Sequence, residues 1–95
     1  MKAYIIADID VFDSDLYKNY QTKTPKTVKK YGGNFVVRGG SPKKLEGDWE
    51  PSRLVVIEFE NVEAAREWYF SEEYQSILNV RQKASNGRMV LVEGA

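Results

Sequence analysis

Three arginines are the first candidates for chemistry in this chain, because each stands beside glycine or apolar residues. Arg38 is followed by Gly39 and Gly40, which let another group approach the backbone closely. A guanidinium beside such a gap can hold a carboxylate or a phosphate through two hydrogen bonds. Arg53 opens a predicted strand, and Arg81 interrupts an otherwise apolar helical face. We therefore take these three side chains as candidates for binding an anion.

Each arginine also has a structural interpretation. Arg38 can equally be a surface residue at a turn, or pair with an acid such as Glu46 or Glu58. Arg53 can pair with Glu46 in the same way. A charge on an apolar face, such as Arg81, must be paired or must extend to the edge of the core. Ion pairing and ligand binding are both open for these residues.

Three aromatic residues are candidate walls of a binding pocket. Trp49 lies in a loop between Gly47 and Pro51, where it can cover a pocket or pack against a partner subunit. Tryptophan is a frequent interface anchor, so we favour the second role. Trp68 and Tyr69 follow the helical spacing of an apolar stripe, and we favour a place in the core for them over a place in a pocket wall.

Two carboxylates suggest a possible general base. Asp8 and Glu58 fall on one face of the predicted sheet together with Tyr4. A half-buried carboxylate with a raised pKa can accept a proton from a substrate, with Tyr4 as the proton donor. Such acids more often pair with an arginine across an interface.

The residues that are missing exclude several kinds of chemistry. The chain has no His and no Cys, which excludes an imidazole-ligated haem, a thiolate zinc site and a Ser-His or Cys-His nucleophile pair. No spacing of carboxylates suggests Mg²⁺ or Ca²⁺, so we expect no metal and no cofactor.

Net charge is zero, yet residues 1–45 carry +5 and residues 46–95 carry −5. The basic half can attract an anionic partner, or it can be a solvated helix face.

The elements that must position these residues follow from periodicity and capping residues. Strands are predicted at 3–9, 34–38, 53–60 and 88–93, the last one after a turn at Asn86-Gly87. A helix begins at Asp13 or Ser14 and ends at Gly32-Gly33, with a kink or restart near Pro25. A second helix begins after residue 61 and breaks at 70–71. This order, β-α-β-β-α-β, predicts one α+β domain over residues 1–95: a ferredoxin-like sandwich with a four-stranded antiparallel sheet and two helices on one face.

The strands are apolar on both faces, which predicts a second cover for the sheet. Residues 5–7, 54–57 and 89–92 form unbroken apolar runs, whereas a strand with one wet face should alternate. We therefore expect a homodimer with two-fold symmetry.

No apolar run approaches the length of a membrane span, and the apolar start is too short for a signal peptide, so we expect a cytoplasmic protein without membrane contact. Tyr17, Tyr20 and Tyr31 share the apolar arc of the first helix, away from its lysines, so we expect no nucleic-acid partner.

Several segments together resemble a bacterial family called domain of unknown function 1330. They are residues 4–8, 35–40, 45–59, 65–75 and 90–94, so the resemblance covers essentially the whole chain. It implies a ferredoxin-like fold of the dimeric α/β-barrel group, and no activity, because the family's function is unassigned. Other families of that group include cofactor-independent monooxygenases, small isomerases and haem enzymes, and the absence of His argues against the haem type.

Three functions are compatible with these observations. The leading hypothesis is a homodimer that binds a small anionic or aromatic molecule in a pocket between sheet and helices. Arg38, Arg53 and Arg81 would supply positive charge, and the aromatic residues described above would supply apolar walls. The alternatives are a cofactor-independent isomerase or monooxygenase-like enzyme with Asp8 or Glu58 as base, and a structural or interaction protein without a ligand.

Overall fold

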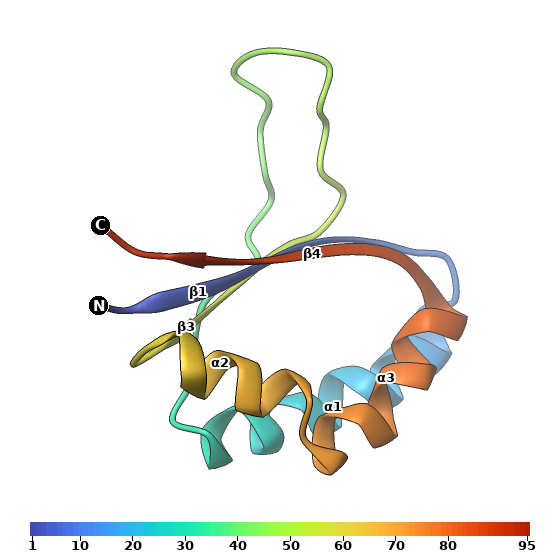
Figure 1. The fold of residues 1–95 in the computed structure, drawn as a ribbon. Coiled ribbons are helices and arrows are strands. Elements are labelled where there is room, and N and C mark those ends of the chain that lie inside the picture. The colour runs from blue at the N-terminus through green and yellow to red at the C-terminus, as the bar shows by residue number, and fades with distance from the viewer.

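Seven elements follow one another along the chain, and the computed structural model describes all 95 residues. They are β1 (Ala3–Val11), α1 (Ser14–Lys30), β2 (Asn34–Gly39), β3 (Leu54–Phe59), α2 (Val62–Tyr69), α3 (Glu72–Ala84) and β4 (Ser85–Glu93). The strands form one antiparallel sheet in the order β2-β3-β1-β4. All three helices cover one face of it, which confirms the α+β class (Figure 1). No helix combines the length and the apolarity needed to cross a membrane.

The core lies between the helices and the inner face of the sheet. Alternate residues of β1, from Ala3 to Ile9, are buried there, as expected when successive side chains point to opposite faces. The intervening residues point to the other face, which no element of the chain covers (Figure 1). We call this uncovered side the open face.

Side-chain caps fix where the helices begin. Asp13, Asn61 and Ser71 each accept a hydrogen bond from the backbone N–H three residues later. The Ser71 cap starts α3 directly after α2, so the predicted break at 70–71 is confirmed. The helical layer therefore consists of three helices rather than the two of a simple ferredoxin-like sandwich.

Helix α1 runs without interruption from Ser14 to Lys30 with Pro25 inside it, so the predicted restart near Pro25 is wrong. Pro25 has no N–H to give to the carbonyl of Gln21, one turn earlier. That carbonyl instead accepts a hydrogen bond from the Arg38 side chain of β2, at 2.7 Å. A donor from the sheet thus replaces the missing helical hydrogen bond, and the helix continues.

The predicted turn at Asn86-Gly87 is also wrong. β4 begins at Ser85, directly after α3, and Asn86 and Gly87 pair with Asp10 and Ile9 of β1. The Asn-Gly pair is a strong turn signal, but here the glycine serves packing. A Cβ on Gly87 would collide with the guanidinium of Arg81, which lies beneath the strand.

A long loop connects β2 and β3, and we call residues 40–53 the arm. It projects away from the helices on the side of the open face (Figure 1). Three consecutive residues at its base, Gly39, Gly40 and Ser41, have positive φ, which turns the chain sharply out of the sheet.

Candidate functional site

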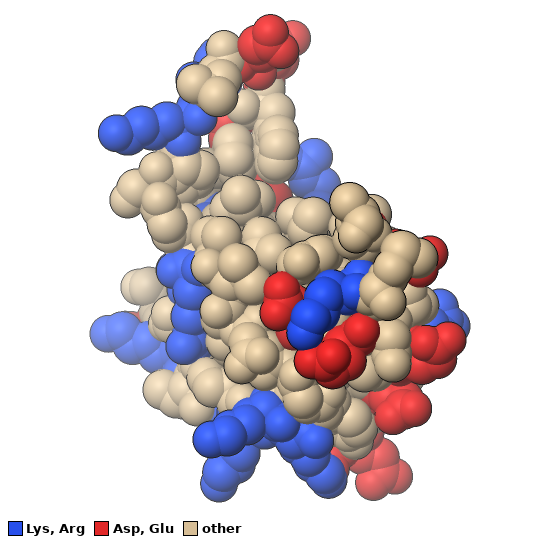
Figure 2. Space-filling view, turned by 90° about the vertical axis from the view of Figure 1, so that its left-hand side faces the viewer, with Lys and Arg blue, Asp and Glu red and all other residues tan.

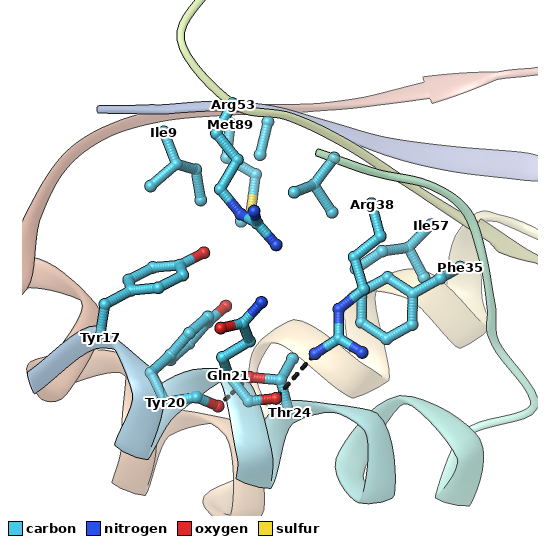
Figure 3. A pocket seen from close by; sticks show the side chains of 12 residues that line it. Ile9, Tyr17, Tyr20, Gln21, Thr24, Phe35, Arg38, Arg53, Ile57 and Met89 are labelled. Atoms are coloured by element: carbon cyan, nitrogen blue, oxygen red, sulfur yellow. Dashed lines mark hydrogen bonds between the residues drawn. The ribbon is translucent and has the colours of Figure 1, made fainter. Parts of the chain in front are cut away.

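A small cavity lies between α1 and the inner face of the sheet, near the base of the arm (Figure 3). Aliphatic side chains of the sheet form part of its wall, and the rest comes from two arginines (one in β2, one just before β3), two polar side chains of α1 and three aromatic rings. The residues of this second group are Arg38, Arg53, Gln21, Thr24, Tyr17, Tyr20 and Phe35. The pocket that we predicted between sheet and helices has a counterpart here, and two of the three candidate arginines line it.

Arg38 reaches the cavity from β2. Its guanidinium lies over the Phe35 ring, 4.6 Å from the centroid, and donates to the Gln21 carbonyl. It forms no salt bridge, so the pairing with Glu46 or Glu58 that we considered is not observed. One guanidinium nitrogen thus serves α1, and the side chain lies at the exposed edge of the cavity (Figure 3).

Arg53 reaches the cavity from the start of β3. Its guanidinium lies over the Tyr17 ring, 5.7 Å from the centroid, and forms no salt bridge. Its Nε is buried without a hydrogen-bond partner. Gly39 leaves space for this side chain, because a Cβ there would lie 3.1 Å from the Arg53 Nη1 atom. A charged donor is therefore held in an aromatic environment with part of its hydrogen-bonding capacity unused.

Residues of α1 complete the cavity, and sequence reasoning assigned them no role in a site. Tyr17 and Tyr20 had been placed in the core, and both are indeed buried. The Tyr20 hydroxyl lies 2.8 Å from that of Tyr74, and burial raises the pKa values of both phenols. Thr24 donates to the Tyr20 carbonyl. One signal did exist for this part of the site: Pro25 leaves a carbonyl at Gln21 that needs a donor from elsewhere.

The cavity is small as it stands. Its volume is ≈ 20 Å³, which is room for about one water molecule. Ligand pockets are usually about 300–1,000 Å³. A ligand larger than water therefore needs a side chain to move, and Arg53 has the weakest attachment because only the Tyr17 ring holds its guanidinium.

Two other predicted pocket residues lie in the core instead. Trp68 has no exposed surface and its indole N–H donates to Thr27, which agrees with the core role that we favoured. Arg81 is only 6% exposed and lies under Gly87. It forms no salt bridge. Burial raises the pKa of the Tyr74 hydroxyl, and the positive charge of Arg81 lowers it and so opposes this larger effect. Neither side chain lines the cavity.

Tyr69 lies at a separate shallow hollow between α2 and β4, where Phe70 and Val90 are its neighbours. The hollow is almost entirely apolar, with Arg66 stacked over the Phe70 ring as its one charged group. It shares no polar group with the cavity behind Arg38, so Tyr69 and the arginines do not form one site.

Asp8 and Trp49 meet on the open face, on the opposite side of the sheet from the cavity. The Asp8 carboxylate accepts hydrogen bonds from the Trp49 indole at 2.9 Å, from Arg88 at 3.0 Å and from the Ser52 backbone at 3.3 Å. The Trp49 indole, followed by Arg88 and Ser52, lowers the pKa of Asp8. The raised pKa that a general base would need is therefore not found, and this carboxylate instead fixes the arm to β1.

Tyr4 and Glu58 form a cross-strand pair on the open face. The Tyr4 hydroxyl donates to Glu58 at 3.2 Å, and this hydrogen bond raises the pKa of Tyr4. Asp8 pairs with Leu54, four residues further along β1, which places it about 13 Å from this pair. The three residues share a face as predicted, but only two of them are in contact.

Charges on the helical layer are separated, as the sequence indicated. Figure 2 shows basic and acidic side chains on different sides of this layer. Lys30 of α1 and Glu73 of α3 form a salt bridge where the two sets meet, and Tyr31 donates to the same carboxylate. No group of three or more acidic side chains converges where a metal ion could bind.

The fold defines the class of protein: the sheet order and the helices on one face are those of ferredoxin-like α+β proteins. The chain belongs to the family described as domain of unknown function (DUF1330), whose model matches residues 2–95. No functionally curated protein is similar to it in sequence.

Several solved structures share the fold. A protein of unknown function from Rhodopseudomonas palustris, RPA0582, is 17% identical, with a TM-score of 0.79 over 99% of this chain and 82% of that one. SnoaB, a cofactor-independent oxygenase from Streptomyces nogalater, is 12% identical, with a TM-score of 0.68 over 99% and 93%. A dimeric protein of unknown function with a ferredoxin-like fold from Bacteroides fragilis is 8% identical, with a TM-score of 0.57 over 98% and 96%. At these identities the likeness concerns the fold alone.

Proposed function

We propose that the protein binds a small anionic molecule with a planar or aromatic body in the cavity between α1 and the sheet. One observation carries this proposal: Arg38 and Arg53, neither of them in a salt bridge, face a space walled by aromatic rings. A carboxylate or phosphate matches two guanidinium groups, and a flat apolar body matches the rings.

Energetics support an anion at this position. A buried polar atom without a partner costs free energy, more so when the group is charged. The Nε of Arg53 is such an atom, and an oxyanion would accept its hydrogen bond. Because the cavity holds about one water, we expect Arg53 to leave the Tyr17 ring and contact the ligand, which enlarges the space.

Thermal unfolding against small carboxylates, phosphates and phenols tests the proposal. A ligand at 100 times its Kd adds about 2.7 kcal/mol to the free energy of unfolding, which raises the Tm of a domain of this size by roughly 10 °C or more. Arg53→Ala should abolish the shift. Arg88→Ala is the matched control, because it removes an arginine from the open face.

The outcomes separate a ligand-binding protein from a structural or interaction protein. A shift lost in Arg53→Ala and kept in Arg88→Ala supports the cavity. A shift that survives Arg53→Ala places the ligand elsewhere and overturns the proposal. No shift from any compound favours a structural or interaction protein. An enzyme with a carboxylate base draws less support, because Asp8 lies on the open face with a lowered pKa.

We also propose that the protein is a homodimer in which the open face of one copy packs against that of another, as in a dimeric α/β barrel. Apolar side chains on this face support the proposal. Val90 and Val92 of β4 are substantially exposed, and Ile6, Leu54 and Val56 are half-buried beside them. Each would be covered by a second sheet.

A further inference from the structure

The arm is longer and more exposed than a connection between two paired strands requires. Antiparallel neighbours such as β2 and β3 can be joined by about two to five residues, and unstructured loops beyond about 12–15 residues are uncommon in compact domains unless they have a function. At the tip, Leu45 is 96% exposed, and Trp49 on the returning limb is 52% exposed. No residue of the arm belongs to the hydrophobic core.

Specific contacts nevertheless hold the arm in one position. Asp8 of β1 accepts from the Trp49 indole and from the Ser52 backbone. Lys44 and Glu50 form a salt bridge at 3.3 Å between the two limbs. The arm therefore stands over the sheet instead of lying on it, and it encloses a hollow of ≈ 880 Å³ together with the open face.

The open face alone is a small interface. With about 4.8 Å between strands and about 3.3 Å per residue, four strands with five to nine paired positions cover roughly 300–600 Å² in plan, and the accessible surface of the side chains on that area is larger. A stable dimer buries about 800 Å² per partner. Any element on the same side of the molecule would add to the buried area, and the arm is the element that projects there (Figure 1).

Charges on the arm fit a copy of itself. Lys43 and Lys44 stand on the outgoing limb, and Glu46, Asp48 and Glu50 on the tip and the returning limb. Basic and acidic groups thus occur together on the projecting part (Figure 2). A two-fold interface brings one surface against the same surface of the partner, so it must be self-complementary. A surface with both signs meets this condition, whereas the lysine-rich back of α1 does not.

We propose that the arm clasps the second copy: the partner's sheet enters the hollow, and Leu45 and Trp49 pack against it. This inference rests on the homodimer proposed above and assigns the element that stabilises it. Each copy extends one arm around the other, so the pair is held by the two sheet faces and by two symmetry-related clasps. The aromatic and leucine side chains are the apolar anchors of this contact.

Sedimentation velocity tests the clasp with the full-length protein and an arm-shortened variant, in which a Gly-Ser turn of about four residues replaces residues 42–50. The variant should keep the fold, as read by circular dichroism, because no residue of 42–50 belongs to the hydrophobic core. We expect its dimer dissociation constant to rise roughly tenfold or more. Leu45→Asp should act in the same direction. Phe12→Asp, on an exposed phenylalanine between β1 and α1, is the matched control and should leave the dissociation constant unchanged.

A photo-crosslink locates the contact. Because the chain has no cysteine, a Leu45→Cys variant can be labelled at this one position with a benzophenone. In mixed dimers with isotopically labelled unmodified protein, we expect crosslinks to residues of the partner's open face, such as Val56 or Val90.

Three outcomes overturn the inference, and they are distinguishable. A monomeric full-length protein at micromolar concentration removes the homodimer and the clasp together. A dimer whose dissociation constant is unchanged by shortening the arm removes the clasp and leaves the homodimer. Crosslinks confined within one chain, in a protein that is dimeric, also remove the clasp.

Discussion

Arg53 shows how one residue can be important for binding without being a fixed part of the site. Its guanidinium has an aromatic ring on one side, no acid nearby and an Nε without a partner. A side chain in this state can be recruited by an anion at little structural cost. We therefore regard it as the mobile member of the cavity, whereas Arg38 is tied to α1.

Asp8 predicts a pH response of the arm. Its partners favour the charged carboxylate, so its pKa in the folded protein lies below the ordinary value of 3.8. The stabilisation is complete above that value and is lost as the pH falls through the lowered pKa. We expect Trp49 fluorescence to change only below about pH 4. In Asp8→Asn the change should disappear. A transition above that pH, or the same transition in Asp8→Asn, would contradict this assignment.

Gly87 predicts a packing effect. Gly87→Ala places a Cβ where the Arg81 guanidinium lies, and overpacking of this kind typically costs about 1–3 kcal/mol. Urea unfolding measures the loss. The neighbouring Asn86→Ala should cost less, because Asn86 is exposed. In an Arg81→Met background the penalty of Gly87→Ala should shrink, and an undiminished penalty would show that the guanidinium is not its cause.

Residue roles could be predicted from the sequence only in part. The arginines were identified by their neighbours in the chain, and Arg38 and Arg53 do line the cavity, while their binding of a ligand stays a prediction. Arg81 does not line this cavity, because a charge on an apolar helical face gives no information on where the end of its side chain lies. The position of Trp49 on the open face could not be predicted either. In a loop as long as the arm, tertiary contacts decide where a side chain lies, and here that contact is with Asp8.

At the scale of elements, α1 and β2 depend on each other through one hydrogen bond. Pro25 leaves the Gln21 carbonyl without its helical donor, and Arg38 supplies one. The helix therefore stays continuous at a position where proline usually breaks or kinks a helix. The sequence indicated the unpaired carbonyl but not the strand residue that satisfies it, because this contact joins residues that are distant in the chain.

A double-mutant cycle tests this dependence. Arg38→Ala should cost about 1 kcal/mol in the free energy of unfolding, because it leaves the carbonyl to water at an exposed edge. In a Pro25→Ala background the alanine N–H can bond to Gln21, so Arg38→Ala should cost less. Denaturant unfolding of the four proteins gives the coupling energy. Additive effects would mean that the guanidinium and the proline act independently.

Element order was predictable because each helix carries its own cap and each strand its own apolar run. The break between α2 and α3 followed from Ser71 in the same way. The start of β4 was not predictable, since Asn86-Gly87 has the local form of a turn. Two tertiary effects outweigh that local preference: β4 pairs with β1 over nine positions, and the Arg81 side chain needs the space that Gly87 leaves.

At the scale of the whole molecule, the uncovered sheet determines the expected assembly. Val56→Lys places a charge at the centre of the open face, on one of the two inner strands. It should leave the monomer fold intact and raise the dimer dissociation constant roughly tenfold or more, as measured by sedimentation equilibrium. Glu67→Lys, on the exposed side of α2, is the control. Unchanged association in Val56→Lys would place the interface on another surface.

The sheet order also has a consequence for the chain as it is synthesised. β1 is an inner strand, but its two partners begin only at Leu54 and Ser85, so it leaves the ribosome long before either can pair with it. Non-local pairing of this kind is slow and leaves unpaired edges exposed. During that interval the apolar run from Ile5 to Ala7 is free to associate with other nascent chains. Asp8 follows it directly and Asp10 comes two residues later, so both place charge in the same strand and act as gatekeepers against aggregation until β4 arrives.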